Sequence, residues 1–222
     1  MKTIHTQDGK TIEIQINKRL FGKNNEIAAK NLEFLKANEV ESVDVLGSIG
    51  SGKTSVIQQL VKNLNSKKRI AAITGDLTTT IDADRIGKYG AHVLQINTDQ
   101  GCHLDANMVR NAFDQLDMSD YDLIFIENVG NLICPGSYPV GAHQRIVVVS
   151  TTEGPYMIVK HPHIFRDATV VIINKIDMAE AMGVDVKQLK KDALTIKPSI
   201  KVVFTCAKTG EGIEELISAL NI

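Results

Sequence analysis

The chain has 222 residues, of which 43% are hydrophobic and 23% charged, and its formal net charge is −1. This composition predicts one globular domain with a sizeable core, and the balanced charge gives no support for nucleic acid or an anionic membrane as a partner. No apolar run approaches the roughly 18 residues that span a bilayer, and the first residues lack the apolar centre of a secretory signal. We therefore predict a cytoplasmic protein.

The N-terminal part of the chain divides into two predicted segments. Residues 1–24 form an extension in which Thr11 to Ile16 alternate in polarity as in a strand, and no chemistry is assigned to them. From Asn25 to Asn38 the apolar residues follow helical spacing. We expect this helix to pack on a domain formed by residues 25–222.

Short runs of Val, Ile and Leu then alternate with helical patterns. The runs predicted as buried strands span residues 42–46, 69–74, 92–96, 122–126, 145–150, 169–173 and 201–204. Helices are predicted over residues 53–65, 106–116 and 212–220. This order indicates an α/β fold of the P-loop NTPase type, with a mostly parallel sheet and helices on both faces. Such sheets place their sites at the carboxyl ends of the strands.

The first predicted strand leads directly into Gly47-Ser-Ile-Gly-Ser-Gly-Lys-Thr54, which matches the phosphate-binding pattern G-x-x-x-x-G-K-S/T. Glycines let backbone N–H groups wrap a triphosphate, and the following helix adds the positive end of its dipole. The pattern assigns Lys53 to the β- and γ-phosphates and the Thr54 hydroxyl to Mg²⁺. The alternative is a simple turn between a strand and a helix. The residues predicted to bind the nucleotide here are Gly47, Ser48, Gly50, Ser51, Gly52, Lys53, Thr54 and Ser55.

A second motif, Asn174-Lys-Ile-Asp177, follows a later strand and indicates which base is bound. A carboxylate at Asp177 accepts hydrogen bonds from N1–H and the exocyclic amine of guanine, which adenine does not offer. The Lys175 stem would cover the base, and Asn174 would fix the loop. The alternative is a polar turn that ends a strand. Cys206, Ala207 and Lys208 follow the last strand, where a backbone group meets the base oxygen, so we predict that GTP and GDP bind.

Hydrolysis of GTP needs Mg²⁺, a positioned water molecule and charge stabilisation. We assign the catalytic roles to Lys53, Asp76 and Glu127, and the Mg²⁺ site to Thr54, Asp76 and Glu127. The Gly130 N–H would sense the γ-phosphate. No glutamine stands in an obvious water-positioning place and no arginine of the same chain is evident, so we predict slow intrinsic hydrolysis.

The residues after Asp76 are predicted to form a mobile first switch loop. This loop would contain Thr78 to Thr80 and Asp82 to Arg85, with Asp84 capping a helix. Lys160 and Arg85 are candidates to reach the phosphates of a partner subunit.

Cys102 and His103 lie between a predicted strand and a predicted helix, at the edge of the sheet that holds the phosphate loop. A thiolate and an imidazole suit Zn²⁺ or Ni²⁺, and Cys134 is a plausible third ligand. The alternative is that the cysteines are buried apolar residues and that His103 packs or caps a helix. The residues alone leave both possibilities open.

Several motifs occur together in the order seen in the HypB family of hydrogenase nickel-incorporation GTPases, which the chain resembles over about residues 25–220. They are Gly75-Asp-Leu77, Asp82-Ala-Asp-Arg-Ile86, Gly101-Cys-His-Leu-Asp-Ala106, Glu127-Asn-Val-Gly-Asn-Leu-Ile-Cys-Pro135, Ser150-Thr-Thr-Glu-Gly154 and Asn174-Lys-Ile-Asp177. The resemblance implies a GTPase of the signal-recognition and MinD-like class that forms a homodimer on GTP binding. It also implies that Cys102, His103 and Cys134 ligate Zn²⁺ or Ni²⁺ at the dimer interface.

By the same resemblance, the expected partners are hydrogenase maturation proteins and the large subunit of nickel–iron hydrogenase. The chain has neither the cysteine-rich N-terminal nickel motif nor the histidine-rich stretch of some members. We therefore expect nickel delivery through a site linked to the switch loops. The alternatives are a urease accessory GTPase similar to UreG, a small-molecule kinase, and a regulatory GTPase whose cysteines only pack.

Overall fold

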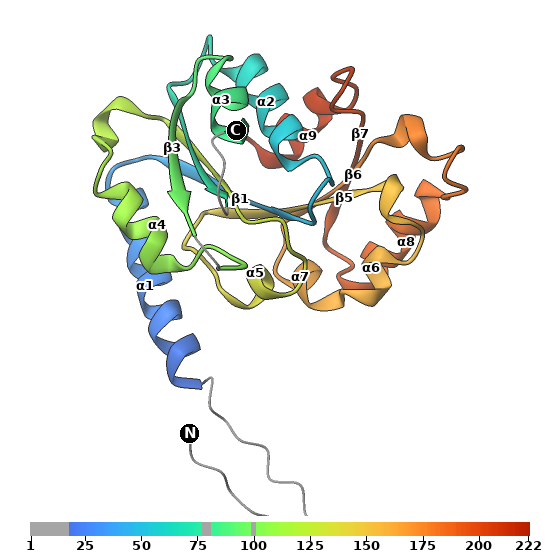
Figure 1. Cartoon of the computed structure of the whole chain (residues 1–222), viewed down its shortest axis with the longest axis horizontal. Helices are drawn as coiled ribbons and strands as arrows, with labels where there is room; N and C mark the ends of the chain where they lie inside the picture. The colour runs from blue at the N-terminus through green and yellow to red at the C-terminus, as the bar shows by residue number, and fades with distance from the viewer. Residues whose placement is uncertain (1–17, 77–80, 99–100) are drawn as a thin grey trace, which may run out of the picture.

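The computed structural model describes residues 18–76, 81–98 and 101–222. Its centre is a sheet of seven strands in the order β3-β2-β4-β1-β5-β6-β7, and every neighbouring pair is parallel (Figure 1). The strands are β1 Glu41–Gly47, β2 Ile70–Asp76, β3 His92–Asn97, β4 Leu123–Glu127, β5 Gln144–Ser150, β6 Val170–Asn174 and β7 Lys201–Thr205. The seven strands predicted between residues 42 and 204 are all present, and the predicted α/β fold is confirmed.

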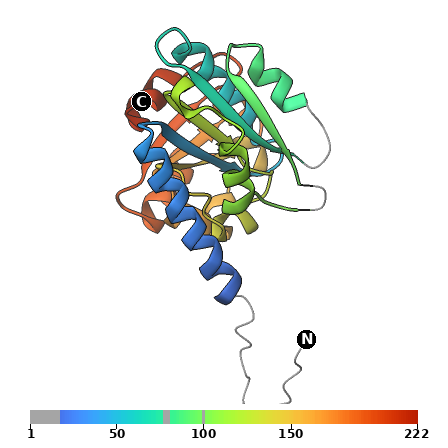
Figure 2. The ribbon, with the colours of Figure 1, turned by 90° about the vertical axis from the view of Figure 1, so that its left-hand side faces the viewer.

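Helices cover both faces of this sheet (Figures 1 and 2). They are α1 Lys18–Ala37, α2 Lys53–Leu64, α3 Ile81–Gly87, α4 Ala106–Phe113, α5 Cys134–Ser137, α6 Met157–Lys160, α7 Pro162–Arg166, α8 Val186–Ile196 and α9 Ile213–Leu220. Helices α2, α3 and α9 pack on one face, and α1, α4, α7 and α8 pack on the other. None of the helices in the described part of the chain is long and apolar enough to cross a membrane.

The alternation of side chains along β1 explains the two cores. Val43 and Val45 belong to the core under α2 and α9, whereas Leu46 belongs to the core on the opposite face. Because β1 lies in the middle of the sheet and is buried on both faces, its C-terminal end is held rigidly by β4 and β5. The phosphate-loop sequence begins at this end.

Helix α1 begins at Lys18, earlier than the predicted start at Asn25, and it runs across the expected boundary between residues 24 and 25. Its extra turns are anchored by polar and aromatic contacts that an apolar pattern does not reveal. Asn24 is 7% exposed, and its amide bonds both the Pro139 carbonyl and the Ala106 N–H, at 2.9 Å each. The Phe21 ring packs against Tyr138.

The segment predicted as a switch loop is helical from Ile81 onward, because it forms α3. Asp82 and Asp84 lie in the first turn of this helix, where a carboxylate is stabilised by the helix dipole. Asp84 is therefore inside the helix and is not its capping residue, contrary to the prediction. Residues 78–80, and the strand proposed over residues 11–16, lie outside the described residues.

Candidate functional site

The phosphate loop connects β1 to α2 and takes its shape from glycine and from its own carbonyl groups. Gly52 precedes the first residue of α2 with a φ of 100°, and a Cβ on it would collide with the amide of Asn174. The side chains of Lys53 and Ser51 both donate to the Ser48 carbonyl, at 3.0 Å each. Burial lowers the pKa of Lys53, so its ammonium group is poised to gain from an anionic partner.

A cavity of about 460 Å³ opens beside this loop. It is lined by the start of α2, the ends of β2 and β4, and α3; among its residues are Lys53, Thr54, Asp76, Asp82, Arg85, Glu127 and Gly130. The Thr54 hydroxyl donates a hydrogen bond of 2.7 Å to Oε1 of Glu127. The structure thus brings all the predicted catalytic and Mg²⁺-binding residues to one cavity.

Glu127 lies at the end of β4, and burial raises the pKa of its carboxyl group to about 7. Its Oε2 atom and the Oγ1 atom of Thr74 are buried without a hydrogen-bond partner among the described residues. Thr74 is paired in register with Glu127 on the neighbouring strand β2. These oxygen donors fit a hard cation such as Mg²⁺, which prefers oxygen ligands.

A second cavity of about 450 Å³ shares Gly52, Ser55, Arg85 and Lys175 with the first. Asn174 forms its buried inner edge and connects three segments. Its amide donates to the Ser51 carbonyl at 2.9 Å, and its Oδ1 accepts from Thr205 Oγ1 at 3.0 Å and from the Ala207 N–H at 3.1 Å. Within the segment predicted to offer a backbone group to the base oxygen, the Ala207 N–H is therefore already bonded to Asn174.

Lys175 and Asp177 stand at the mouth of the second cavity. Lys175 adopts a left-handed conformation with a φ of 59°, and its Nζ donates to the Gly50 carbonyl at 2.7 Å. The Cys206 thiol is buried and donates to Oδ1 of Asp177 at 3.2 Å. Sequence analysis assigned Cys206 only through its main chain, and its contact with the carboxylate is a new feature.

Arg85 is the candidate residue whose observed position differs most from the sequence prediction. It lines both cavities of its own chain, although no arginine of the same chain was expected near the phosphates. Its guanidinium group donates to Asp82 at 3.2 Å and to the Ser55 hydroxyl at 3.1 Å. Arg85 lies in α3, a helix that the sequence analysis did not predict. Lys160, the other candidate, has its ammonium group 5.9 Å from the centre of the Tyr156 ring.

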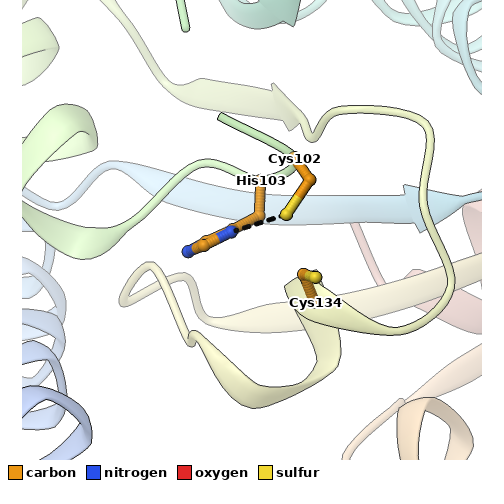
Figure 3. Close-up of side chains that lie close together, drawn as sticks. All are labelled: Cys102, His103 and Cys134. Atoms are coloured by element: carbon orange, nitrogen blue, oxygen red, sulfur yellow. Dashed lines mark hydrogen bonds between the residues drawn. The ribbon is translucent and has the colours of Figure 1, made fainter. Parts of the chain in front are cut away.

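Cys102, His103 and Cys134 form the one group of three or more potential metal-ligating side chains found among the described residues. Their ligand atoms all lie within 4.8 Å of one another. Figure 3 shows Cys102 and His103 side by side on one loop, with Cys134 across from them on another segment. Cys102 Sγ is 3.6 Å from His103 Nδ1, and Cys134 is the first residue of α5.

The surroundings of Cys102 and His103 favour the neutral form of each side chain. Burial lowers the pKa of His103, whose ring stacks on Tyr138 with 4.0 Å between ring centroids. Interaction with the Cys134 thiol, followed by burial, raises the pKa of Cys102. A neutral imidazole offers a lone pair to a metal, and a thiol must lose its proton to bind one. The cluster can therefore supply one nitrogen and two sulfur donors.

Residues 42–204 match the CobW/HypB/UreG, nucleotide-binding domain family. The chain is 46% identical over 208 residues to the probable hydrogenase maturation factor HypB of Methanocaldococcus jannaschii, and the match covers 94% of each protein. The crystal structure of hydrogenase maturation factor HypB from Archaeoglobus fulgidus is 41% identical, with a TM-score of 0.84 over 90% of this chain and 98% of that one. The crystal structure of HypB from Helicobacter pylori in complex with nickel is 36% identical, with the same TM-score of 0.84 over 90% and 94%.

Proposed function

The chain belongs to the CobW/HypB/UreG nucleotide-binding family, within its HypB group, and from this premise we propose that it is a GTPase that delivers nickel during maturation of nickel–iron hydrogenase. The observation that carries the proposal is the closeness of Cys102, His103 and Cys134, within 4.8 Å, together with the fact that the segment leading to Cys134 lines the cavity beside the phosphate loop from Glu127 to Gly130. Relatives named as hydrogenase maturation factors, and a related structure that holds nickel, support the same conclusion.

The nucleotide part of the proposal assigns each described residue a task. The phosphate loop and Lys53 bind the phosphates, and Asp177 accepts hydrogen bonds from guanine at the mouth of the second cavity. Thr54, Asp76 and Glu127 would hold Mg²⁺, which when bound neutralises charge that develops between the β- and γ-phosphates. The buried, unpartnered oxygens of Glu127 and Thr74 support this assignment. The reaction is hydrolysis of GTP to GDP and phosphate, at a slow intrinsic rate.

The metal is cargo in this proposal. Two thiolates and an imidazole bind either Ni²⁺ or Zn²⁺, and three protein ligands leave a coordination position through which the ion can enter and leave. The recipient is the hydrogenase large subunit, reached with other maturation proteins. A reducing cytosol, where we place the protein, keeps the thiols available.

The proposal includes a homodimer that forms on GTP binding. Ile49 in the phosphate loop is 81% exposed and Ile133, next to Cys134, is 71% exposed. Large apolar side chains this exposed, flanking both sites, suit a surface that a second copy covers. Cys102 is exposed as well, so a partner subunit could complete its coordination.

Equilibrium binding of Ni²⁺ and Zn²⁺, measured against a chromophoric chelator, tests the metal site. Cys102→Ala and His103→Ala should each weaken binding at least about 10-fold and leave GTP affinity within about 3-fold. His163→Ala removes an imidazole outside the cluster and serves as the matched control. Unaltered metal affinity in Cys102→Ala would show that the ligand assignment is wrong.

The base is tested separately by competition between GTP, ATP and xanthosine triphosphate. Wild-type protein should reject ATP, and Asp177→Asn should lose GTP affinity on the order of 100-fold while gaining affinity for xanthosine triphosphate. The reason is that an amide donates to the carbonyl that xanthine carries in place of the guanine amine. Equal binding of GTP and ATP by the wild type would exclude guanine recognition.

A further inference from the structure

Asn131 links the phosphate loop to both halves of the cysteine–histidine cluster. Its main-chain N–H donates to the Gly47 carbonyl at 3.0 Å, at the start of the phosphate loop. Its side-chain amide donates to the Cys102 carbonyl at 3.3 Å, and its Oδ1 accepts from the Ile133 N–H at 2.8 Å. A single residue therefore contacts the phosphate loop, a metal-ligating residue and the neighbour of another.

Asn128 holds the other side of the same loop. Its main-chain N–H donates to the Val45 carbonyl of β1 at 3.1 Å, and its Oδ1 accepts the Leu104 N–H at 2.9 Å. Asn128 is 1% exposed, so these bonds are shielded from water. The segment Cys102 to Leu104 is thus hydrogen-bonded at both ends: its Cys102 carbonyl accepts from Asn131, and its Leu104 N–H donates to Asn128. We call this pair the asparagine clamp.

Both asparagines of the clamp belong to the segment from Glu127 to Cys134, which leads from the cavity beside the phosphate loop to the cysteine–histidine cluster. The segment begins at Glu127, which accepts the Thr54 hydroxyl. It continues through Gly130, which is packed so closely on Ile49 of the phosphate loop that a Cβ there would lie 2.9 Å from the Ile49 nitrogen. It ends at Cys134. A shift of the phosphate loop or of Glu127 therefore moves the clamp.

Cys134 is connected to this segment by the chain itself, but Cys102 and His103 are not. Cys102 lies 29 positions before Asn131 in the sequence, and Leu104 lies 24 positions before Asn128. Apart from the interaction between the Cys102 and Cys134 thiols, hydrogen bonds from the clamp are the described polar contacts between this segment and the Cys102–His103 loop. An amide side chain carries its donor and its acceptor on separate atoms, so Asn131 can donate to the Cys102 carbonyl and accept from the Ile133 N–H at the same time.

We propose that Asn131, with Asn128, is a positioning residue that couples nucleotide state to nickel affinity by setting where Cys102 and His103 stand relative to Cys134. The inference rests on the proposed function, in that it requires one protein to bind both GTP and Ni²⁺. Asn128 lines the first cavity, whereas Asn131 lines neither of the two cavities assigned to the nucleotide. Removal of the clamp should leave each site competent when the other is empty and abolish the influence of one on the other.

The experiment measures the Ni²⁺ dissociation constant by chelator competition, with Mg²⁺–GDP and with Mg²⁺ and a non-hydrolysable GTP analogue. The ratio of the two constants is the coupling factor, and in the wild type we expect it to differ from 1 by at least about 5-fold. In Asn131→Ala the factor should fall to within about 2-fold of 1. The affinity of this variant for the GTP analogue without nickel should stay within about 3-fold of the wild type. A purely structural role would instead lower both affinities and leave the ratio unchanged.

Two further variants sharpen the result. Asn131→Asp keeps an acceptor for the Ile133 N–H but has no donor for the Cys102 carbonyl, so it should also lose coupling. Asn63→Ala removes another exposed amide that donates to a carbonyl, that of Gln59 at 2.7 Å, and should keep the wild-type factor. Because coupling is reciprocal, nickel must change the affinity of the wild type for the analogue by the same factor.

The outcomes separate the two proposals. The role of the clamp is overturned if both Asn131 variants keep the wild-type coupling factor. It is also overturned if the wild type binds both ligands with a coupling factor of 1. In both cases the proposed function stands. A wild type that fails to bind GTP or Ni²⁺ overturns the proposed function as well.

Discussion

Thr54 and Glu127, on α2 and β4, are joined by a hydrogen bond of 2.7 Å in which the hydroxyl donates to the carboxyl group. Glu127 is 5% exposed, and burial raises its pKa from 4.5 to about 7. Without a cation or nucleotide, the carboxyl group is therefore partly protonated at neutral pH. This pKa gives a stability test that needs no ligand.

The unfolded chain releases the Glu127 proton near pH 4.5 and the folded protein near pH 7. The folded state thus binds this proton more tightly, and the stabilisation it gives is lost as the pH rises through that window. At 1.36 kcal/mol per pKa unit, the shift corresponds to about 3 kcal/mol. Urea unfolding of nucleotide-free wild type and Glu127→Gln should show the wild type losing about this much, relative to the variant, between pH 5 and pH 8. A constant difference across that range would mean that Glu127 is already ionised in the fold.

Cys206 is predicted to orient the guanine-reading carboxylate. Its thiol donates to Oδ1 of Asp177, and its own side chain is buried. Cys206→Ala frees Asp177 and should lower GDP affinity by about 5- to 10-fold, because a thiol is a weak donor and the loss of its hydrogen bond costs about 1 kcal/mol. Cys206→Ser restores a donor and should stay within about 3-fold of the wild type. Calorimetric titration measures the GDP affinity of both variants. Their Ni²⁺ affinity is the control and should not change. Equal GDP affinity in Cys206→Ala and Cys206→Ser would contradict the role of the Cys206 thiol in orienting Asp177.

Gly130 is predicted to keep the phosphate loop in register with β4. A Cβ at this position would lie 2.5 Å from Ile49 Cγ1 and 2.9 Å from the Ile49 nitrogen. Gly130→Ala should therefore displace the loop and weaken GTP binding by about 10-fold or more. Adding Ile49→Ala removes the side-chain clash but not the backbone clash, so it should restore only part of the affinity. Full restoration would locate the constraint in the side chain alone.

The parts of the site that could be predicted from sequence are those with local patterns. Strand periodicity and the glycines before Lys53 identified β1, the phosphate loop and α2, and the placement of Asn174 and Asp177 followed from their position after β6. Helix α8 was not predicted, although Asp185 caps it and Leu189 and Ala193 face the core. Two buried apolar residues four positions apart, Leu189 and Ala193, are too weak a pattern to predict a helix on their own.

The contacts between distant segments could not be predicted. Asn128 and Asn131 bond main-chain atoms of a loop more than 20 residues earlier, and any polar residue in a loop has the same appearance in sequence. Arg85 was assigned to a loop because acidic residues around it hid a short helix. Cys102 and Cys134 were grouped by residue type, and the structure supplies the closeness that the sequence left open.

A buried ion pair lies beneath the segment that carries the clamp. Arg145 Nε donates to Asp44 Oδ2 at 3.1 Å, and the two side chains are 11% and 2% exposed. Arg145 also donates to the Gly136 carbonyl at 3.3 Å, within the helix that begins at Cys134. Burial raises the pKa of Asp44 despite the neighbouring guanidinium group. Burying the two charges is unfavourable because they lose their hydration, but the pair holds Arg145 where it can bond to α5 and fix the position of that helix.

Breaking this pair from one side should be costly. Arg145→Met leaves a buried carboxyl group without its cation and should lower the free energy of unfolding by about 3–5 kcal/mol. The double variant Asp44→Leu/Arg145→Met removes both charges and should recover much of that loss, because an apolar pair needs no compensation. The exposed pair of Arg110 and Asp114, 34% and 49% exposed, is the matched control, and Arg110→Met should cost no more than about 1 kcal/mol. Urea unfolding of the wild type, Asp44→Leu, Arg145→Met, the double variant and Arg110→Met measures all of these terms. Effects of Asp44→Leu and Arg145→Met that add to the effect of the double variant within about 0.5 kcal/mol would show that the two charges do not depend on each other.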